Sequence, residues 1–184
     1  MSASSSGHRT PSALGPWGRL LLRAAKASAI AGGLVFVAIV LMSIVSIVGR
    51  KLFAAPVPGD VELLQMAAAF ASASFFAYCH MNGGDVKVDF FTAHARPATV
   101  HRLDALGALL VGLFGAVITW RAAAGAWAVR ASGETSMILG LPVWWAQMLM
   151  VPGFALLALA GFYMMVWHWR LANLGVPVHS GGQA

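Results

Sequence analysis

Two histidines and one charged pair are the residues of this sequence whose types and positions could do chemistry. His80 and His168 each lie near one end of a long apolar stretch. Two histidines on facing helices can ligate a haem iron, although a lone histidine there is also an ordinary interfacial residue. Arg50 and Glu62 flank the first connection between apolar stretches, where they either form a salt bridge or remain separately solvated. No nucleophile–base pair, phosphate-binding loop or zinc motif is present, so the sequence predicts no enzyme.

Four long apolar stretches must position these residues, at about 27–48, 63–81, 103–123 and 143–167. A helix that crosses the bilayer core of about 30 Å needs about 20 mainly apolar residues, and each stretch is long enough. Hydrophobic residues make up 59% of the chain and charged residues 10%, whereas a soluble domain is about 25% charged. The composition therefore predicts an all-α integral membrane protein with four transmembrane helices in a lipid bilayer.

The chain divides into three parts. Residues 1–16 are rich in Ser, Gly and Pro and are expected to form a disordered cytoplasmic tail. Residues 17–171 should form the four-helix membrane domain, followed by a flexible cytoplasmic tail at 172–184. No charge occurs from Ala27 to Gly49, which is longer than the apolar region of a signal peptide. We therefore interpret the first stretch as an uncleaved span. A short basic helix, Trp17 to Lys26, is expected to precede it and to merge into it.

The distribution of positive charge predicts the orientation. Eight of the twelve Lys and Arg residues lie on the side of the two termini, and cytoplasmic loops carry the excess of Lys and Arg. Both termini are therefore expected in the cytoplasm. Richness in Ala, Gly and Arg with few Lys residues suggests a bacterium, in which the protein is expected in the inner membrane. The net charge of +6 is explained by this topology, so no nucleic acid is expected as a partner.

The connections contain residues that end or begin helices. The outer loop before the second stretch contains two prolines, and Asp60 is expected to cap the helix that follows. Gly83-Gly84 should end that helix, and Pro97 should begin the third. In between, charged and apolar residues alternate over 85–90, which is typical of a segment lying along the lipid headgroups. We therefore predict a short interfacial helix or segment between spans 2 and 3.

Small residues recur at helical spacing on two of the stretches. They are Ala108, Gly112 and Ala116, with Gly107 and Gly115 beside them, on the third, and Ala67, Ala71 and Ser74 on the second. Such faces let helices approach closely in lipid. They either pack the chain's own bundle or dock a partner protein.

The last two stretches contain one arginine and two prolines of note. Arg121 is the deepest charge, and beside Trp120 it is expected to reach the outer interface. Pro142 should start the last helix, and Pro152-Gly153 should kink it.

Three motifs occur in order along this four-span chain. The first is VGRKLF followed by PVPG and a glutamate, the second is GDVKVDF, and the third is GETS followed by LPVW and PG. Together they resemble the small membrane subunits of tripartite ATP-independent periplasmic (TRAP) transporters, the DctQ family, over about residues 20–170. The family usually has His where this chain has Asp85. The candidate family-motif or subunit-interface residues are Arg50, Phe53, Pro58, Glu62, Gly84, Asp85, Asp89, Gly133, Glu134, Ser136, Pro142 and Trp144.

The resemblance implies a role in secondary active uptake, without a cofactor. A periplasmic binding protein (DctP-type) would deliver an organic anion, typically a carboxylate, and a large multi-span subunit (DctM-type) would carry it inward with sodium. This chain would be the small scaffold or accessory subunit. The resemblance further implies that Arg50, Glu62 and the loop 130–142 face the periplasm and contact the binding protein. The loop at 85–89 would help to position the bundle at the inner surface.

Two other functions remain as alternatives. A membrane anchor or cytochrome b-like subunit of a respiratory enzyme would use His80 and His168 for haem. A stand-alone carrier or channel would need ionisable groups in mid-membrane. No Asp, Glu or Lys lies at that depth in any of the four stretches, which argues against it.

Overall fold

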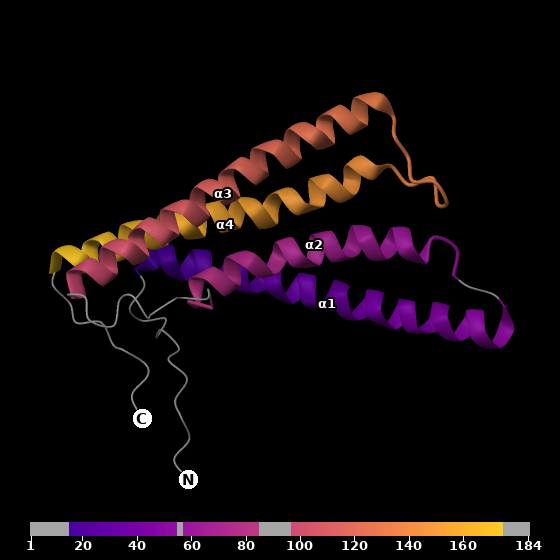
Figure 1. Cartoon of the computed structure of the whole chain (residues 1–184), viewed down its shortest axis with the longest axis horizontal. Coiled ribbons are helices and arrows are strands. Elements are labelled where there is room, and N and C mark those ends of the chain that lie inside the picture. Colours follow the sequence, from indigo (N-terminus) through magenta and orange to yellow (C-terminus); the bar gives the residue numbers. More distant parts are fainter. Residues whose placement is uncertain (1–14, 55–56, 85–96, 175–184) are drawn as a thin grey trace, which may run out of the picture.

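The fold consists of four long α-helices. The computed structural model describes residues 15–54, 57–84 and 97–174. Along these ranges the helices are α1 (Pro16–Phe53), α2 (Asp60–Met81), α3 (Pro97–Ser132) and α4 (Val143–Leu174) (Figure 1). Each is long and apolar enough to cross a membrane. The predicted all-α architecture with four transmembrane helices is therefore confirmed. The interfacial segment predicted between spans 2 and 3 falls on 85–96, outside the described residues.

Three of the helices are longer than a bilayer requires. The 38 residues of α1 measure about 57 Å at about 1.5 Å per residue, against about 30 Å of hydrocarbon. The basic segment from Trp17 to Lys26 is continuous with α1, as predicted. Pro97 begins α3, also as predicted. At the other end of the chain, α4 continues to Leu174, into the segment predicted as a tail.

Glycines end two of the helices in the same way. At the end of α2, Gly83 has φ +69°. Its N–H donates to the carbonyl of His80 at 3.1 Å, and the N–H of Gly84 donates to the carbonyl of Cys79 at 3.0 Å. This is the Schellman arrangement, which satisfies the last carbonyls of a helix and needs a left-handed residue. Gly133, also at φ +69°, ends α3 with the same pair of bonds.

The helices form two antiparallel hairpins, α1–α2 and α3–α4. Figure 1 shows them in the order α1, α2, α4, α3 across the molecule, so α2 and α4 are the inner pair. The main contacts agree: α3 packs on α4, α4 on α2, and α2 on α1. The hairpins converge where α1 begins and α4 ends and splay apart at the opposite end (Figure 1). We call the end where the hairpins converge the inner end and the end where they splay apart the outer end.

Small residues line the α3–α4 crossing. A Cβ on Gly161 would lie 2.5 Å from the Cα of Gly112, and one on Gly115 would lie 2.8 Å from the backbone N of Ala158. The two backbones are therefore in direct contact. In lipid there is no hydrophobic driving force between helices, so close dispersion contacts of this kind stabilise the pair. Ala108 is buried in the same interface, whereas nothing lies within 4 Å of a Cβ on Gly107.

The other two crossings follow the same rule. On α1, a Cβ on Gly32 would lie 2.7 Å from the Cβ of Ser74 on α2. On α4, a Cβ on Gly153 would lie 2.7 Å from the carbonyl oxygen of Ala73. The small faces predicted on spans 2 and 3 thus pack within the chain. α4 runs continuously through Pro152, and the kink predicted there stays a prediction.

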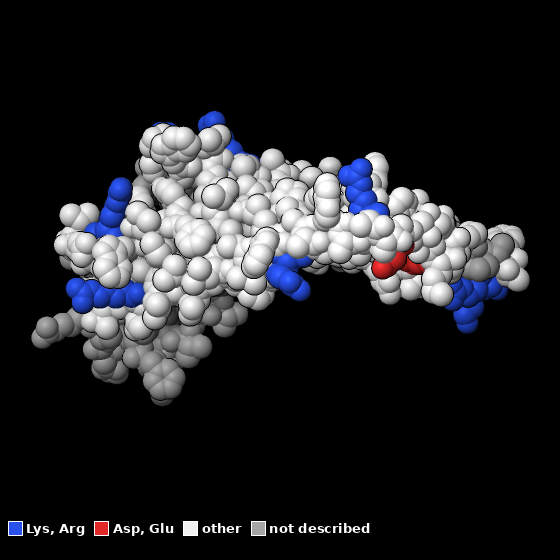
Figure 2. Space-filling view, turned by 90° about the horizontal axis from the view of Figure 1, so that it is seen from above, with Lys and Arg blue, Asp and Glu red and all other residues white. Residues whose placement is uncertain are grey.

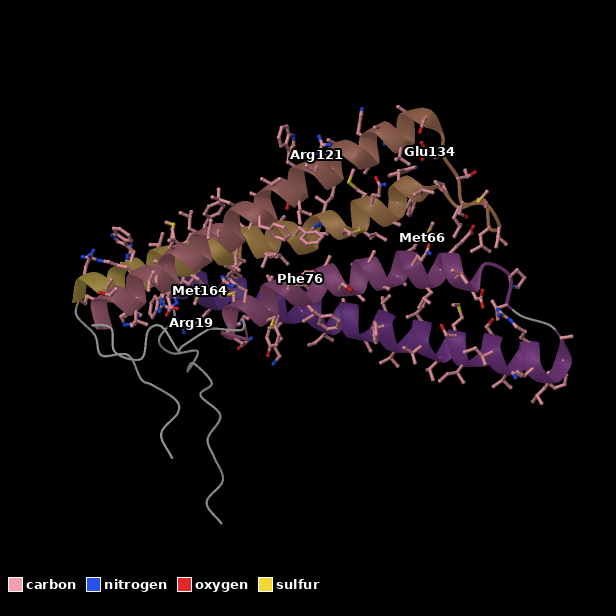
Figure 3. All side chains as sticks on the ribbon, in the orientation of Figure 1. Arg19, Met66, Phe76, Arg121, Glu134 and Met164 are labelled. Carbon is pink, nitrogen blue, oxygen red and sulfur yellow. The ribbon has the colours of Figure 1, made fainter. Side chains whose placement is uncertain are left out.

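Most of the remaining surface is uncharged. On the face in Figure 2, Lys and Arg side chains gather toward the left end of the molecule, and others lie singly along its length and at the right end. Arg121 points away from the bundle on the outer flank of α3 (Figure 3). Its neighbour Trp120 is also exposed.

Replacing Gly161 by Leu should destabilise the chain. The added side chain would meet the backbone of Gly112, and overpacking of this kind costs about 1–3 kcal/mol. We expect a lower thermal unfolding midpoint for the detergent-solubilised protein. Gly107→Leu is the matched control, because it puts the same side chain on a glycine with open space around it. Equal midpoints for the two variants would contradict the crossing.

Candidate functional site

Polar side chains join α1 to α2 at the outer end. The hydroxyl of Ser46 donates to Asp60 Oδ2 at 2.6 Å, and Arg50 Nη2 donates to the same oxygen at 3.1 Å. Ser46 also accepts the N–H of Val57, from the connection, at 3.3 Å. The hydroxyl is fully buried, whereas the Arg50 side chain is 60% exposed. We call Ser46, Arg50 and Asp60 the outer clamp.

The outer clamp answers the open question of the partner of Arg50 and corrects the predicted role of Asp60. Arg50 pairs with Asp60 and not with Glu62, because residues two apart on a helix point to nearly opposite sides, at about 100° per residue. Asp60 therefore faces α1, and Glu62 faces the other hairpin. Asp60 is also not the helix cap: Gly59 occupies that position at φ +71°, without a side-chain capping bond. Instead, Asp60 Oδ1 accepts the N–H of Val61 at 2.8 Å.

Glu62 holds the loop between α3 and α4. Its Oε1 accepts the backbone N–H of Ile138 at 2.9 Å, and its Oε2 accepts that of Leu139 at 3.1 Å. A carboxylate that accepts two adjacent amides forms charge-assisted bonds, which are stronger than neutral ones. The side chain of Leu139 also packs directly over Gly59. One glutamate thus connects the two hairpins where they splay apart.

The loop has a defined internal structure. Ser136 donates its N–H to the carbonyl of Leu141 at 2.8 Å, and the Leu141 N–H donates to Ser136 Oγ at 3.1 Å. Thr135 and Pro142 form an antiparallel bridge around this turn. Gly140 closes it at φ +64°. The turn presents Met137 and Ile138 to the outside at 98% and 65% exposure.

Aromatic and cationic groups meet where α3 ends and α4 begins. The guanidinium of Arg130 lies 4.9 Å from the ring centre of Trp144 and 5.7 Å from that of Trp127. Such cation–π contacts contribute about 0.5–1 kcal/mol at exposed sites. Trp144 is therefore held against the end of α3. Its helix, α4, begins one residue earlier at Val143, directly after Pro142.

The structure does not gather the remaining candidate residues into one site. Phe53 and Pro58 are exposed at the outer end, and Gly133 and Glu134 belong to the end of α3. Glu134 Oε1 accepts a bond from the Ser132 hydroxyl at 3.1 Å. Gly84 lies at the inner end, where a Cβ would lie 2.8 Å from Cys79 Sγ. Asp85 and Asp89 lie outside the described residues.

At the inner end, the structure gives His168 neighbours that sequence reasoning missed. Its ring centre lies 6.0 Å from that of His101 on α3, and its Nδ1 lies 3.7 Å from Asp104 Oδ2. The spacing of His101 and Asp104 was a usable signal, since residues three apart share a helix face. Their meeting with His168 could not be inferred before α3 was paired with α4. His80 is buried at the end of α2, and the haem alternative stays a prediction.

These features describe a small multi-pass membrane protein with polar contacts between its helices at the helix ends and in the connections. The chain belongs to the family described as tripartite ATP-independent periplasmic transporters, DctQ component, whose model matches residues 39–171. The family predicted from the three motifs is therefore confirmed. No curated protein and no solved structure matches the chain.

Replacing Glu62 by Ala should release the outer loop. The amides of Ile138 and Leu139 would lose their acceptors, and a hydrogen bond to a charged group contributes about 1.5–3 kcal/mol. We expect these two amides to exchange with deuterium at least roughly tenfold faster. Glu134→Ala is the control, since that carboxylate bonds Ser132 and not the two amides. Unchanged exchange at 138–139 in Glu62→Ala would contradict the assignment.

Proposed function

We propose that this chain is the small scaffold subunit of a TRAP-type carrier that imports an organic anion, a carboxylate, on a sodium gradient. The observation that supports this most is the family match over residues 39–171. The substrate class and the coupling ion come from the family resemblance alone. On this proposal the substrate pathway lies in the partner subunit.

The packing of the helices supports a scaffold. The small faces at the three crossings are used inside the chain, with backbone against backbone. Fixed crossings of this kind favour one arrangement of the helices, because a shift of either helix would lose many close contacts. A subunit built in this way suits a fixed support for a partner that moves.

Two partners are proposed. The large multi-span subunit (DctM-type) would pack in the bilayer against the apolar outer faces of the bundle, which are extensive: Leu34, Val37 and Leu41 on α1 are all more than half exposed. The periplasmic binding protein (DctP-type) would dock at the outer end. There the loop held by Glu62 presents Met137 and Ile138 in a fixed position.

A pull-down from the native membrane in mild detergent, with mass spectrometry, tests the proposed function. We expect a large multi-span protein in about equal amount. In liposomes, uptake of carboxylates should then need both membrane subunits, the binding protein and a sodium gradient, and the chain alone should transport nothing. Co-purification of a flavin or iron–sulfur enzyme, or a Soret band that His80→Ala abolishes, would replace this proposal by the respiratory anchor.

The proposed orientation can be tested with two cysteines. In a Cys79→Ser background, Met137→Cys and Leu174→Cys place one exposed thiol at each end of the molecule, at positions 98% and 76% exposed. With both termini in the cytoplasm, a membrane-impermeant maleimide should label residue 137 in intact spheroplasts. Residue 174 should react only after permeabilisation. The reverse pattern would overturn the orientation.

A further inference from the structure

Three potential metal ligands converge between α3 and α4 at the inner end. His101 and Asp104 come from the first turns of α3, and His168 comes from the last turns of α4. One ligand atom from each residue lies within 4.8 Å of those from the other two. His101 is 7% exposed and His168 5%, and Asp104 is half-buried. Met164, labelled in Figure 3, lies one turn before His168 on α4 and is also buried.

The helices fix this geometry. His101 and Asp104 are three residues apart and therefore share a face of α3. Ala105 on α3 and Ala172 on α4 are buried nearby. Small side chains at these positions leave room for His168 to lie 6.0 Å from His101, between ring centres, and 3.7 Å from Asp104. The cluster therefore rests on rigid elements from two different helices.

The distances suit a small ion that binds nitrogen and oxygen. Ligands about 2.1 Å from a tetrahedral metal ion lie about 3.4 Å from one another. The distance between His168 Nδ1 and Asp104 Oδ2, 3.7 Å, is already close to that value. Donor atoms that lie within 4.8 Å of one another reach the ligand–ligand distance of about 3.4 Å with side-chain adjustments of about 1 Å.

The donor types narrow the choice of metal. Imidazole suits zinc and neighbouring transition metals, whereas calcium and magnesium prefer sets made only of oxygen. Two histidines with one carboxylate form a common three-ligand set, which leaves a position for water.

We propose that His101, Asp104 and His168 bind a divalent transition-metal ion of the Zn²⁺ type. The ion joins the start of α3 to the end of α4, at the opposite end of the molecule from the outer clamp. There it stabilises the second hairpin, and it also balances the charge of a carboxylate placed beside buried groups. The test of this site does not depend on the proposed transport function, because all three proposed ligands belong to this chain and no partner subunit is needed.

Metal titration of the purified full-length chain tests the site. The protein would carry a tag without histidine and be stripped with a chelator before Co²⁺ is added. We expect one Co²⁺ to bind per chain, with the visible absorption bands of a four-coordinate Co²⁺ site. These bands should disappear when Zn²⁺ displaces Co²⁺. Zn²⁺ should also raise the thermal unfolding midpoint, because an ion that binds only the folded state stabilises it.

Three variants and one control assign the ligands. His101→Gln, Asp104→Asn and His168→Gln should each weaken Zn²⁺ binding by at least about 100-fold, because loss of an outer-shell partner of a metal ligand already costs about 10–100-fold. His80→Gln should leave it unchanged, because His80 is a buried histidine on α2 that does not belong to the cluster. Gel filtration of each variant checks its folding. Asp104→Asn keeps the size of the side chain, so it serves if a histidine variant unfolds.

Two results would overturn the proposal. One is the absence of stoichiometric Co²⁺ binding by the wild-type chain, which needs no variant and would make the cluster an ordinary His–Asp contact. The other is Zn²⁺ affinity that survives replacement of all three residues, which would place the metal on other histidines.

Discussion

The close approach of α2 and α4 at Ala73 and Gly153 is the contact on which the bundle chiefly depends. α1 packs mainly on α2, and α3 packs on α4, so the two hairpins meet mostly through this inner pair. In lipid, burying one apolar side chain against another gains little over contact with acyl chains. Association then requires backbones close enough for many dispersion contacts. Gly153 provides that distance, because any side chain there would collide with the carbonyl of Ala73.

Small residues let the helices pack closely along their length, and polar contacts connect the helices at the outer end. The splay of the hairpins removes close packing at the outer end, and Glu62 bridges that gap with two bonds to the loop between α3 and α4. The outer clamp fixes the neighbouring turn between α1 and α2. Contacts of this kind along its length and at its outer end agree with the proposed role of the chain as a fixed support.

The outer site shows where sequence reasoning reached its limit. The motif made Arg50 and Glu62 natural partners, since both charges flank one turn. Helical geometry shows that only one of two acidic residues two apart on a helix can face α1. The tertiary structure decided that this residue is Asp60, which Arg50 contacts. The role of Glu62 was beyond reach, because its partners, the amides of Ile138 and Leu139, lie 76 and 77 residues away in sequence.

The sequence by itself determined the four spans, most of the residues that begin and end the helices, the small-residue faces and the family. All of these depend on local properties: apolar length, the backbone preferences of glycine and proline, and short motifs. Only the tertiary structure decided which faces meet, that Glu62 holds a distant loop, and that His101 and Asp104 lie beside His168. These depend on the rotation and register of one helix against another. Such quantities are set by packing between segments far apart in the chain, and no local pattern encodes them.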